Sequence, residues 1–328
     1  MKILVVSHAE VEQLLPMSEC IGVMDDALAA LARGEMYQPL RQVIYPPDAG
    51  GVLAMMPAYR SAPDPVYGLK AICVFPKNPE LGKDSHQGGV FLFRGDTGEP
   101  LALVNASAIT AIRTAAVSGV ATRVLARADA GELAIIGSGV QARSHLAAIS
   151  VVRKIKRARI ASRTHDHAQR FVNEMQPRFD FPVSVASSVQ EAVAGADLIV
   201  TATTSREPVI QREWIAPGTH INAVGTYSPR ARELDTATML AASLFVDRRE
   251  SALNEAGDYL IPAQEGVLGP EHIRAELGEI LIGAATGRTS PDEITVFKSL
   301  GLAIEDLASA AHVYRNAQEQ NLGSWVEF

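Results

Sequence analysis

Residues 133–142 constrain the fold of this chain more than any other segment. An apolar run, Leu133–Ile136, is followed by Gly137 and Gly139 and then by a helix-compatible segment from Val140. A strand, a tight turn and a helix start in this order are typical of the Gly-x-Gly-x-x-Gly/Ala motif. Gly137 permits the turn, and Gly139 lets a pyrophosphate approach the N–H groups of the helix start. The motif predicts a dinucleotide site, and a purely structural glycine turn is the alternative.

The end of the next predicted strand indicates which dinucleotide is bound. An NAD site places an acidic residue roughly 20 residues beyond the glycines, where it contacts the ribose 2′-hydroxyl. This chain has Ser162, Arg163 and Thr164 in that region. A carboxylate would repel a 2′-phosphate, whereas a guanidinium and two hydroxyls can hold one. We therefore predict that NADP(H) is preferred and that NAD(H) is possible, the alternative being a solvated arginine at a strand end.

The order of the predicted elements divides the chain into two domains. From Glu132 onward, apolar strands alternate with helices, which is typical of a doubly wound parallel sheet. The strands are expected at 133–136, 159–162, 183–186, 197–201, 220–224, 244–246 and 294–297. The first part is strand-rich, with extended segments at 38–45, 51–56, 69–75, 89–94 and 100–105 and helices at 18–33 and 108–127. With a last helix at 301–319, we predict an α/β chain. Its Rossmann domain covers 118–299, and a second α+β domain for substrate and dimerisation is built from 1–117 and 300–328.

Composition narrows the class of partner. The 328-residue chain has a formal net charge of −7, which gives no general attraction to nucleic acid or to an anionic membrane. Its histidines and two cysteines show no metal-ligand spacing, so no metal is expected. The apolar run at Lys2–Val6 is too short for a signal peptide, and no apolar run approaches a membrane span. We expect a cytoplasmic protein.

Three cations of the first domain stand among apolar or small residues. Lys70 lies within a predicted apolar strand, Arg113 within a helix of small residues, and Arg41 in an extended segment. Burying such cations is costly without an anionic partner. Each alone is compatible with a structural ion pair or a snorkelling side chain. Together they suit a small carboxylate substrate, with arginine as the bidentate partner.

Ordered motifs along nearly the whole chain resemble the ornithine cyclodeaminase/μ-crystallin family. They are Gly51-Val-Leu-Ala-Met-Met-Pro, Lys70, Arg113-Thr-Ala-Ala-Val-Ser, Ile136-Gly-Ser-Gly-Val-Gln-Ala, Ile221-Asn-Ala-Val-Gly, Arg232-Glu-Leu-Asp, Val246-Asp and Phe297-Lys-Ser-Leu-Gly-Leu-Ala-Ile-Glu-Asp. The resemblance implies a Rossmann domain, a homodimer whose sheets join across the interface, and substrate carboxylate binding by Arg41, Lys70 and Arg113.

Apart from Thr114, which lies in the predicted helix at 108–127, the predicted cofactor contacts come from the glycine motif and from the carboxyl ends of the strands, where ligands of such sheets bind. They are Thr114, Gly137, Ser138, Gly139, Val140, Gln141, Ser162, Arg163, Thr164, Thr201, Ala202, Thr203, Ala223, Gly225 and Ser299.

One departure from the family pattern bears on the reaction. Ornithine cyclodeaminases carry Asp in a Gly-Gly-Asp-x-Pro pattern, and this chain has Tyr227 at that position. A tyrosine, with an ordinary pKa of about 10, is a poor substitute for a carboxylate that shuttles protons. The last half-reaction of the cyclodeaminase chemistry does not depend on that aspartate. It is hydride transfer to C2 of a cyclic ketimine such as Δ1-pyrroline-2-carboxylate or Δ1-piperideine-2-carboxylate.

We therefore expect a ketimine reductase that forms L-proline or L-pipecolate, with Lys70, Tyr227 or water handling the proton. Four alternatives stay open: ornithine cyclodeamination, another amino-acid dehydrogenase, a reductase that condenses an amine with a keto acid, and a μ-crystallin-like protein that binds a ligand with NADPH.

Overall fold

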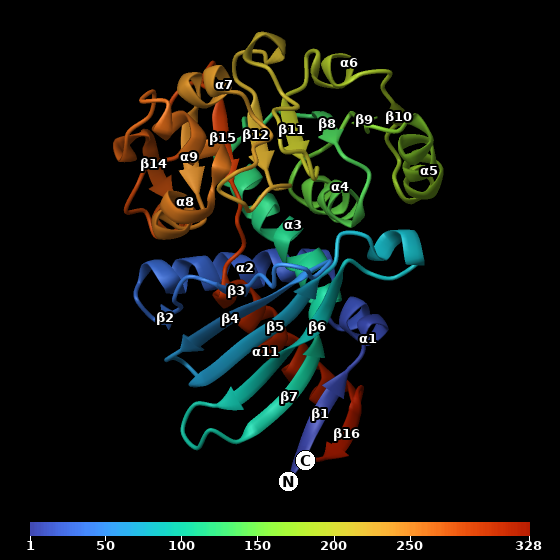
Figure 1. The fold of residues 1–328 in the computed structure, drawn as a ribbon, viewed down its shortest axis with the longest axis vertical. Helices are drawn as coiled ribbons and strands as arrows, with labels where there is room; N and C mark the ends of the chain where they lie inside the picture. The colour runs from blue at the N-terminus through green and yellow to red at the C-terminus, as the bar shows by residue number, and fades with distance from the viewer. The chain divides into compact units, whose positions relative to one another are not determined.

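The computed structural model describes the backbone of residues 1–328 and every side chain except that of Pro79. The chain forms two compact units, and most of their elements are labelled in Figure 1. The terminal unit is Met1–Arg113 with Gly301–Phe328, and the central unit is Thr114–Leu300. The sequence-based boundaries fall after residues 117 and 299, whereas the compact units change within helix α3 (Ala106–Leu125) and after Leu300.

The central unit contains an eight-stranded sheet in which neighbouring strands run parallel. The strand order is β10-β9-β8-β11-β12-β15-β13-β14. The direction of winding reverses between β8 and β11, and ligands of such sheets bind at this switch point. This arrangement confirms the predicted Rossmann-type sheet. The strands are β8 (Glu132–Ile136), β9 (Arg157–Ala161), β10 (Val183–Val185), β11 (Leu198–Thr201), β12 (His220–Ala223), β13 (Ser243–Val246), β14 (Ile273–Glu276) and β15 (Thr295–Lys298).

Helices follow most strands of the central unit. They are α4 (Val140–Val152), α5 (His165–Met175), α6 (Val189–Val193), α7 (Thr236–Ala241), α8 (Arg249–Glu255), α9 (Gly257–Gln264) and α10 (Leu277–Leu281), with short 3-10 turns at Gln176–Arg178, Arg212–Trp214 and Pro270–His272. Buried residues form two core clusters, one including Leu146 and Phe171, the other including Ile221 and Val246. Strands β11, β12 and β15 are buried along their whole length, and β11 accordingly begins with the apolar run Leu198–Val200.

The terminal unit contains the second sheet. Its order is β16-β1-β7-β6-β5-β4-β2, and β3 also pairs with β4. Its pairs are antiparallel apart from β1 with β7. The strands are β1 (Lys2–Val6), β2 (Met36–Tyr37), β3 (Gln42–Ile44), β4 (Val52–Arg60), β5 (Val66–Val74), β6 (His86–Arg94), β7 (Pro100–Asn105) and β16 (Ser324–Glu327). The expected strand at 38–45 is reduced to β3, and β1, β2, β14 and β16 were not predicted.

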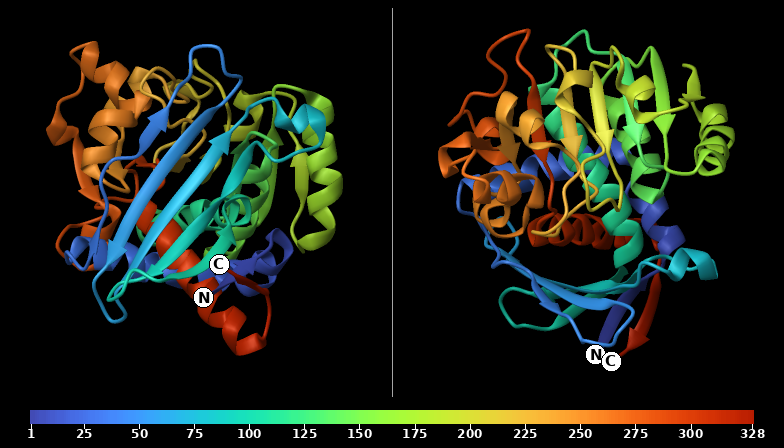
Figure 2. Two further views of the ribbon diagram at one scale, coloured as in Figure 1. Left: turned by 60° about the horizontal axis from the view of Figure 1, so that its bottom comes forward. Right: turned by 45° about the horizontal axis from the view of Figure 1, so that its top comes forward.

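Helices cover one face of this sheet. They are α1 (His8–Leu14), α2 (Met17–Ala32) and α11 (Ala303–Gln320), and a 3-10 turn spans Asn78–Leu81. In the right view of Figure 2, α11 (red) runs along one face of the sheet, and no helix of the terminal unit lies on the other. The fit on the covered face is close, because a Cβ built on Gly68 would lie 2.7 Å from Cδ1 of Leu307. This confirms that the last helix packs on the first domain.

Strand alternation separates the two faces of the terminal sheet. In β4, Ala54, Met56 and Ala58 are buried, while the residues between them are only half-buried. The less buried side of the sheet is apolar, and we call it the open sheet face. Its residues are Leu53, Met55, Pro57, Tyr59, Tyr67, Leu69, Ala71, Cys73, Phe91, Phe93 and Leu103.

We expected no apolar run that approaches the length of a membrane span, and helix α3 is an exception. Contrary to that expectation, it is long and apolar enough by length and composition to cross a membrane. However, 72% of the apolar window is buried inside the protein, as expected for a core helix.

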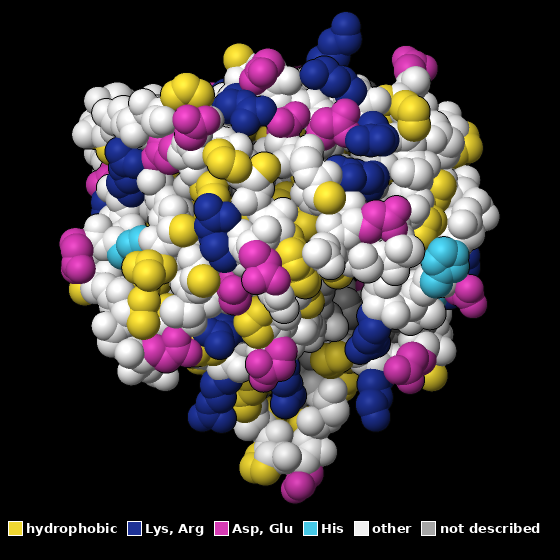
Figure 3. All heavy atoms as spheres, turned by 90° about the horizontal axis from the view of Figure 1, so that it is seen from above, with side chains coloured by type: hydrophobic (Ala, Val, Ile, Leu, Met, Phe, Trp, Pro, Cys, Tyr) yellow, Lys and Arg dark blue, Asp and Glu magenta, His cyan; other side chains and the backbone are white. Residues whose placement is uncertain are grey.

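On the face drawn in Figure 3, Lys and Arg side chains are interspersed with Asp and Glu side chains. That face therefore carries no extended field of one sign.

Candidate active site

A buried cluster of charges lies in the terminal unit. Lys70 and Arg113 are only 3% and 4% exposed. The Lys70 Nζ lies 2.7 Å from Oδ2 of Asp306. The Arg113 Nε donates to Oδ1 of Asp306 at 3.0 Å, and its Nη1 donates to Glu305 at 2.7 Å. The structure thus brings together two of the predicted substrate-binding residues and adds two carboxylates that sequence reasoning missed.

Local structure explains why these side chains meet. Lys70 lies opposite Met56 of β4 and Val90 of β6, whose side chains are buried on the covered side of the sheet. Glu305 and Asp306 lie in the first turn of α11, which packs on that side. A helix N-terminus also favours acidic side chains, because its unpaired N–H groups carry partial positive charge.

Arg41, the third predicted cation, approaches the same segment. Its Nη2 donates to the carbonyl oxygen of Gly301 at 2.9 Å. Gly301 has a φ of +79°, and a Cβ built there would lie 2.5 Å from Nη1 of Arg113. Glycine therefore allows the backbone to pass between the two arginines. All three predicted cations contact residues 301–306.

The electrostatic surroundings bring Lys70 into the range of proton transfer. Burial lowers the pKa of Lys70 to about 8, an effect opposed by Asp306 and reinforced by Arg113 and Arg41. Burial and the positive charges of Lys70 and Arg113 also lower the pKa of His86 to about 4. An ammonium with this pKa can hold a proton at neutral pH and give it up to a substrate.

The glycine motif of the central unit has the geometry that a dinucleotide requires. Gly137 has a φ of +122°, and a Cβ there would collide with the carbonyl oxygen of Ala202. Gly139 is the N-cap residue of α4, and a Cβ built on it would have no atom within 4 Å. The start of α4 therefore leaves room for a phosphate.

Other predicted cofactor residues lie at the carboxyl ends of the strands. The hydroxyls of Ser138 and Ser162 are 2.9 Å apart, between the glycine turn and the end of β9. Ser299 follows β15; its Oγ is buried and has no hydrogen-bond partner in the part of the chain that the structure describes. An unpaired buried hydroxyl at this edge fits a polar ligand group.

Two of the residues that we expect to contact the 2′-phosphate of NADP(H) are accessible to solvent. Arg163 and Thr164 are exposed, and Arg163 makes no hydrogen bond or ion pair within the described residues. Thr164 stands at the N-cap of α5, but its side chain makes no capping hydrogen bond. Both side chains are thus available to a ligand.

A buried network that sequence reasoning missed ties the ends of β11 and β12 together. Glu233 is fully buried and accepts hydrogen bonds from Thr201 Oγ1, from the N–H and Oγ1 of Thr203, and from the N–H of Gly225. Burial raises its pKa above the usual value. Glu233 therefore fixes three of the residues predicted to face the cofactor.

Lys298 and Asp258 extend this network. The Lys298 Nζ lies 2.9 Å from Asp258 and donates to the carbonyl oxygen of Thr226 at 2.7 Å. The Asp258 carboxylate also accepts from the N–H of Glu233 at 2.7 Å. The sequence feature that could have indicated this network is Lys298, which follows the apolar residues Val296 and Phe297 of β15. Lys70 was identified from a similar position beside apolar residues of a strand.

The remaining predicted residues differ in exposure. Thr114 is 8% exposed and Ala223 is fully buried, so Ala223 can offer a ligand only its backbone. Val140 is exposed at the start of α4, followed by the partly buried Gln141. Tyr227 follows β12 and is 42% exposed.

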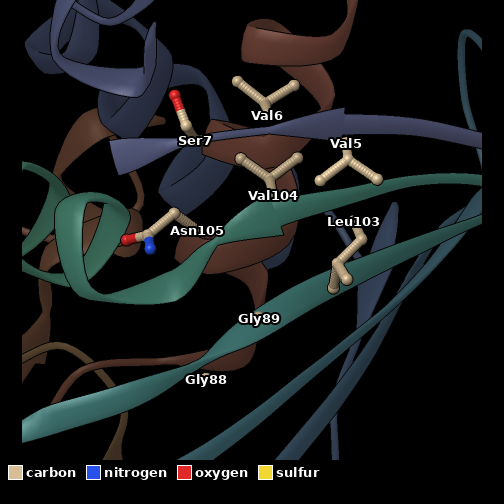
Figure 4. Close-up of a pocket in the computed structure, with 8 residues that line it drawn as sticks. All are labelled: Val5, Val6, Ser7, Gly88, Gly89, Leu103, Val104 and Asn105. Carbon is tan, nitrogen blue, oxygen red and sulfur yellow. The ribbon is translucent and has the colours of Figure 1, made fainter. Parts of the chain in front are cut away.

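A pocket in the terminal unit lies apart from these residues. Figure 4 shows that it is formed by β1, β6, β7 and their ends; the lining residues are Val5, Val6, Ser7, Gly88, Gly89, Leu103, Val104 and Asn105. Ser7 caps α1, and the Asn105 Oδ1 accepts from the N–H of Ala108. Its two polar side chains are thus engaged in local structure, and the pocket contains none of the predicted site residues.

The fold defines a class: a nicotinamide-dependent oxidoreductase with a Rossmann-type unit and a second unit built from both chain ends. Comparison with known families identifies the group within this class. Residues 1–321 match the ornithine cyclodeaminase/mu-crystallin family. The chain belongs to this family.

The similar proteins include reductases of cyclic imines. The chain is 39% identical over 326 residues to a Delta(1)-pyrroline-2-carboxylate reductase of Bacillus cereus, covering 99% of this chain and 100% of that protein. It is 41% identical over 306 residues to the ketimine reductase mu-crystallin of Mus musculus, covering 92% and 93% of the two chains.

Solved structures with similar folds carry nicotinamide cofactors. The Delta(1)-pyrroline-2-carboxylate reductase of Thermococcus litoralis, in complex with NADH and L-proline, has a TM-score of 0.95 and 40% identity, covering 98% of this chain and 99% of that chain. An archaeal alanine dehydrogenase dimer with bound NAD has a TM-score of 0.94 and 35% identity, with both chains fully covered.

Proposed function

We propose that this protein reduces a cyclic ketimine carboxylate with NAD(P)H, converting Δ1-pyrroline-2-carboxylate to L-proline or Δ1-piperideine-2-carboxylate to L-pipecolate. The observation that carries this proposal is the meeting of Arg41, Lys70 and Arg113 at residues 301–306. The names of the similar reductases support the same substrate class.

The terminal unit supplies the groups that bind the carboxylate. Arginine is the side chain that best matches the planar, two-oxygen geometry of a carboxylate, and Arg41 and Arg113 both lie at residues 301–306. Glu305 and Asp306 hold Arg113 in one orientation, so little side-chain entropy is lost on binding. An apolar ligand would not require such a set of buried cations.

The reaction adds a hydride to C2 of the imine and a proton to its nitrogen, leaving a secondary amine. The bound nicotinamide cofactor supplies the hydride. Lys70 is the candidate that holds the proton, because burial lowers its pKa to about 8. A group with that pKa is protonated at pH 7 and loses its proton readily. Tyr227 is the second candidate, as its position after β12 is that of the cyclodeaminase aspartate.

We also propose a preference for NADPH over NADH. The three residues that follow β9 are Ser162, Arg163 and Thr164. They supply one guanidinium and two hydroxyl groups and no carboxylate. The exposure of Arg163 and Thr164 supports this preference. The similar structures contain NADH or NAD, so the proposed preference rests on the residues of this chain alone.

We further propose a homodimer formed through the open sheet face. Eleven apolar residues share this face, and the rings of Tyr59 and Tyr67 lie 4.5 Å apart on it. A contiguous apolar surface of this kind is typical of a protein interface. The similar alanine dehydrogenase is described as a dimer, which favours a second copy of the chain as the occupant.

The proposed activity is tested by following NADPH and NADH absorbance at 340 nm with each of the two ketimines. Loss of absorbance with formation of L-proline or L-pipecolate is the expected result. Proline and ammonia formed from ornithine and NAD would instead establish a cyclodeaminase.

Alanine dehydrogenation is the second candidate, because a similar fold is an alanine dehydrogenase. The same assay, run with alanine and NAD, distinguishes it. NADPH fluorescence that changes without turnover of any substrate would indicate a binding protein.

A further inference from the structure

We propose that Asp306 is a positioning residue: it holds the Lys70 ammonium and the Arg113 guanidinium as one pair and thereby sets the pH range over which Lys70 carries its proton. This inference rests on the proposed function, in which Lys70 supplies the proton to the imine. Asp306 itself is assigned no contact with substrate.

The two oxygens of the Asp306 carboxylate contact different cations. Oδ2 lies 2.7 Å from Nζ of Lys70, and Oδ1 accepts from Nε of Arg113 at 3.0 Å. Asp306 is 1% exposed, so water does not screen these interactions appreciably. One carboxylate on α11 thus bridges a lysine on β5 and an arginine on α3.

Glu305 serves as the comparison for Asp306, because the ion pair that Glu305 forms is with Arg113. It lies in the same turn of α11, is fully buried, and binds Nη1 of Arg113 at 2.7 Å. The described ion pair of Lys70, however, is with Asp306. Glu305 therefore compensates one of the two cations, whereas Asp306 compensates both.

The charged groups that face Lys70 come from several elements. Arg113 of α3 and Arg41 both lower the pKa of Lys70, and His86 of β6 lies close enough to sense its charge. Asp306 is the carboxylate that acts in the opposite direction on Lys70. Removing the charge of Asp306 should therefore favour loss of the Lys70 proton.

A purely structural role for Asp306 predicts a different result. Loss of packing alone would lower stability and activity at every pH without moving the midpoint of Lys70 deprotonation. The midpoint is therefore the decisive quantity, and it can be measured without substrate or cofactor.

The experiment follows the 13Cε resonance of Lys70 by NMR as a function of pH in the full-length protein. The resonance is assigned by its loss in Lys70→Arg. In Asp306→Asn we expect the midpoint to fall by about 1–3 pH units, the usual effect of losing an adjacent opposite charge. The alkaline limb of the kcat/KM profile for ketimine reduction should move in the same direction.

Two further variants complete the test. Glu305→Gln removes a buried carboxylate from the same turn but leaves the Lys70 contact, so its midpoint shift should be clearly smaller. Asp306→Glu retains the charge and should fold even where Asp306→Asn does not. The longer glutamate side chain cannot keep the ion pairs with Lys70 and Arg113 at their present distances. Because the negative charge remains, the midpoint of Lys70 deprotonation should fall by less than in Asp306→Asn.

The outcomes separate the inference from the proposed function. An unchanged Lys70 midpoint in the Asp306 variant that folds, or an equal shift in Glu305→Gln, overturns the positioning role. A wild-type protein that reduces neither ketimine overturns the proposed function alone, because the NMR titration still reports on Asp306.

Discussion

Lys70 and Arg113 lie almost entirely out of contact with solvent, and an unpaired buried cation costs several kcal/mol. Asp306 and Glu305 offset that cost at contacts of 2.7–3.0 Å. Arg41 is only partly buried and reaches the cluster through the Gly301 carbonyl. At the residue scale, Arg41 is therefore the cation that can be changed with the least damage to the fold.

Replacing Arg41 by lysine should weaken substrate binding. Lysine keeps the charge but not the paired N–H donors, and hydrogen bonds to charged groups are worth about 1.5–3 kcal/mol. We expect the KM for the ketimine to rise about ten- to a hundred-fold, with a smaller change in kcat. Steady-state kinetics checks this, with Arg33→Lys at an exposed ion pair as the control. An unchanged KM would remove Arg41 from the site.

Arg163 should decide between the two cofactors. In Arg163→Ala, the loss of a charged hydrogen bond to a 2′-phosphate should raise the KM for NADPH about ten-fold or more. The KM for NADH should stay close to that of the wild type. Arg170→Ala, an exposed arginine within α5, is the control and should change neither value. Equal losses with both cofactors would contradict the predicted role.

At the scale of elements, the start of α11 organises the terminal unit. The helix lies on the covered sheet face and brings Glu305 and Asp306 to Lys70 of β5. The backbone just before the helix turns at Gly301, in the left-handed region that side chains rarely adopt. Because of this turn, the chain between β15 and α11 can approach the two arginines.

Gly301→Ala should therefore affect both stability and substrate binding. The left-handed conformation costs alanine about 1–2 kcal/mol, and the added Cβ would push the Arg113 guanidinium aside. We expect a lower free energy of unfolding in urea and a raised KM for the ketimine. Gly34→Ala is the matched control, because Gly34 has a φ of +75° and no atom within 4 Å of a Cβ. It should show the stability loss alone, and a raised KM in both variants would refute the contact argument.

At the scale of the whole molecule, the open sheet face leaves apolar surface that the terminal unit does not cover. Leu69 stands within it, opposite Pro57 of β4 and Phe91 of β6. We expect the wild-type protein to be a dimer and Leu69→Asp to be monomeric in size-exclusion chromatography with light scattering. Leu240→Asp, at an exposed leucine on α7, should remain dimeric. A monomeric wild type would argue against the proposed interface.

Two buried histidines should make the protein sensitive to acid. Burial lowers the pKa of His145 to about 4 and that of His220 to about 3, from a usual value near 6.5. The unfolded chain therefore takes up protons near pH 6.5, while the folded chain does not until the pH is much lower. Stability is present in full above pH 6.5 and is lost as the pH falls toward 4.

Each histidine should contribute about 1.4 kcal/mol per pH unit within that window. Urea unfolding at pH 7.5, 6.5 and 5.5 measures the slope before most carboxylates titrate. His145→Gln should make the slope shallower, because one buried histidine is removed. A free energy of unfolding that is constant from pH 7.5 to 5.5 would contradict this prediction.

Local sequence patterns were sufficient for the parts of the protein that depend on neighbouring residues. The strand, glycines and helix at 132–152 follow from backbone conformation and burial along a short segment. The position of Lys70 inside an apolar strand likewise marked it as a candidate site residue from its sequence neighbours alone. Short strands such as β2 and β16 were missed, because a few residues carry too little periodicity to distinguish a strand from a loop.

The sequence by itself thus determined the Rossmann-type unit and the family, and it singled out the three cations that we propose as the carboxylate site. Only the tertiary structure decided which carboxylates compensate them, because Asp306 is separated from Lys70 and Arg113 by most of the chain. The same holds for Glu233, which collects donors from the ends of two strands and a loop. Pairing between distant side chains depends on strand register and helix packing, and no local pattern encodes either.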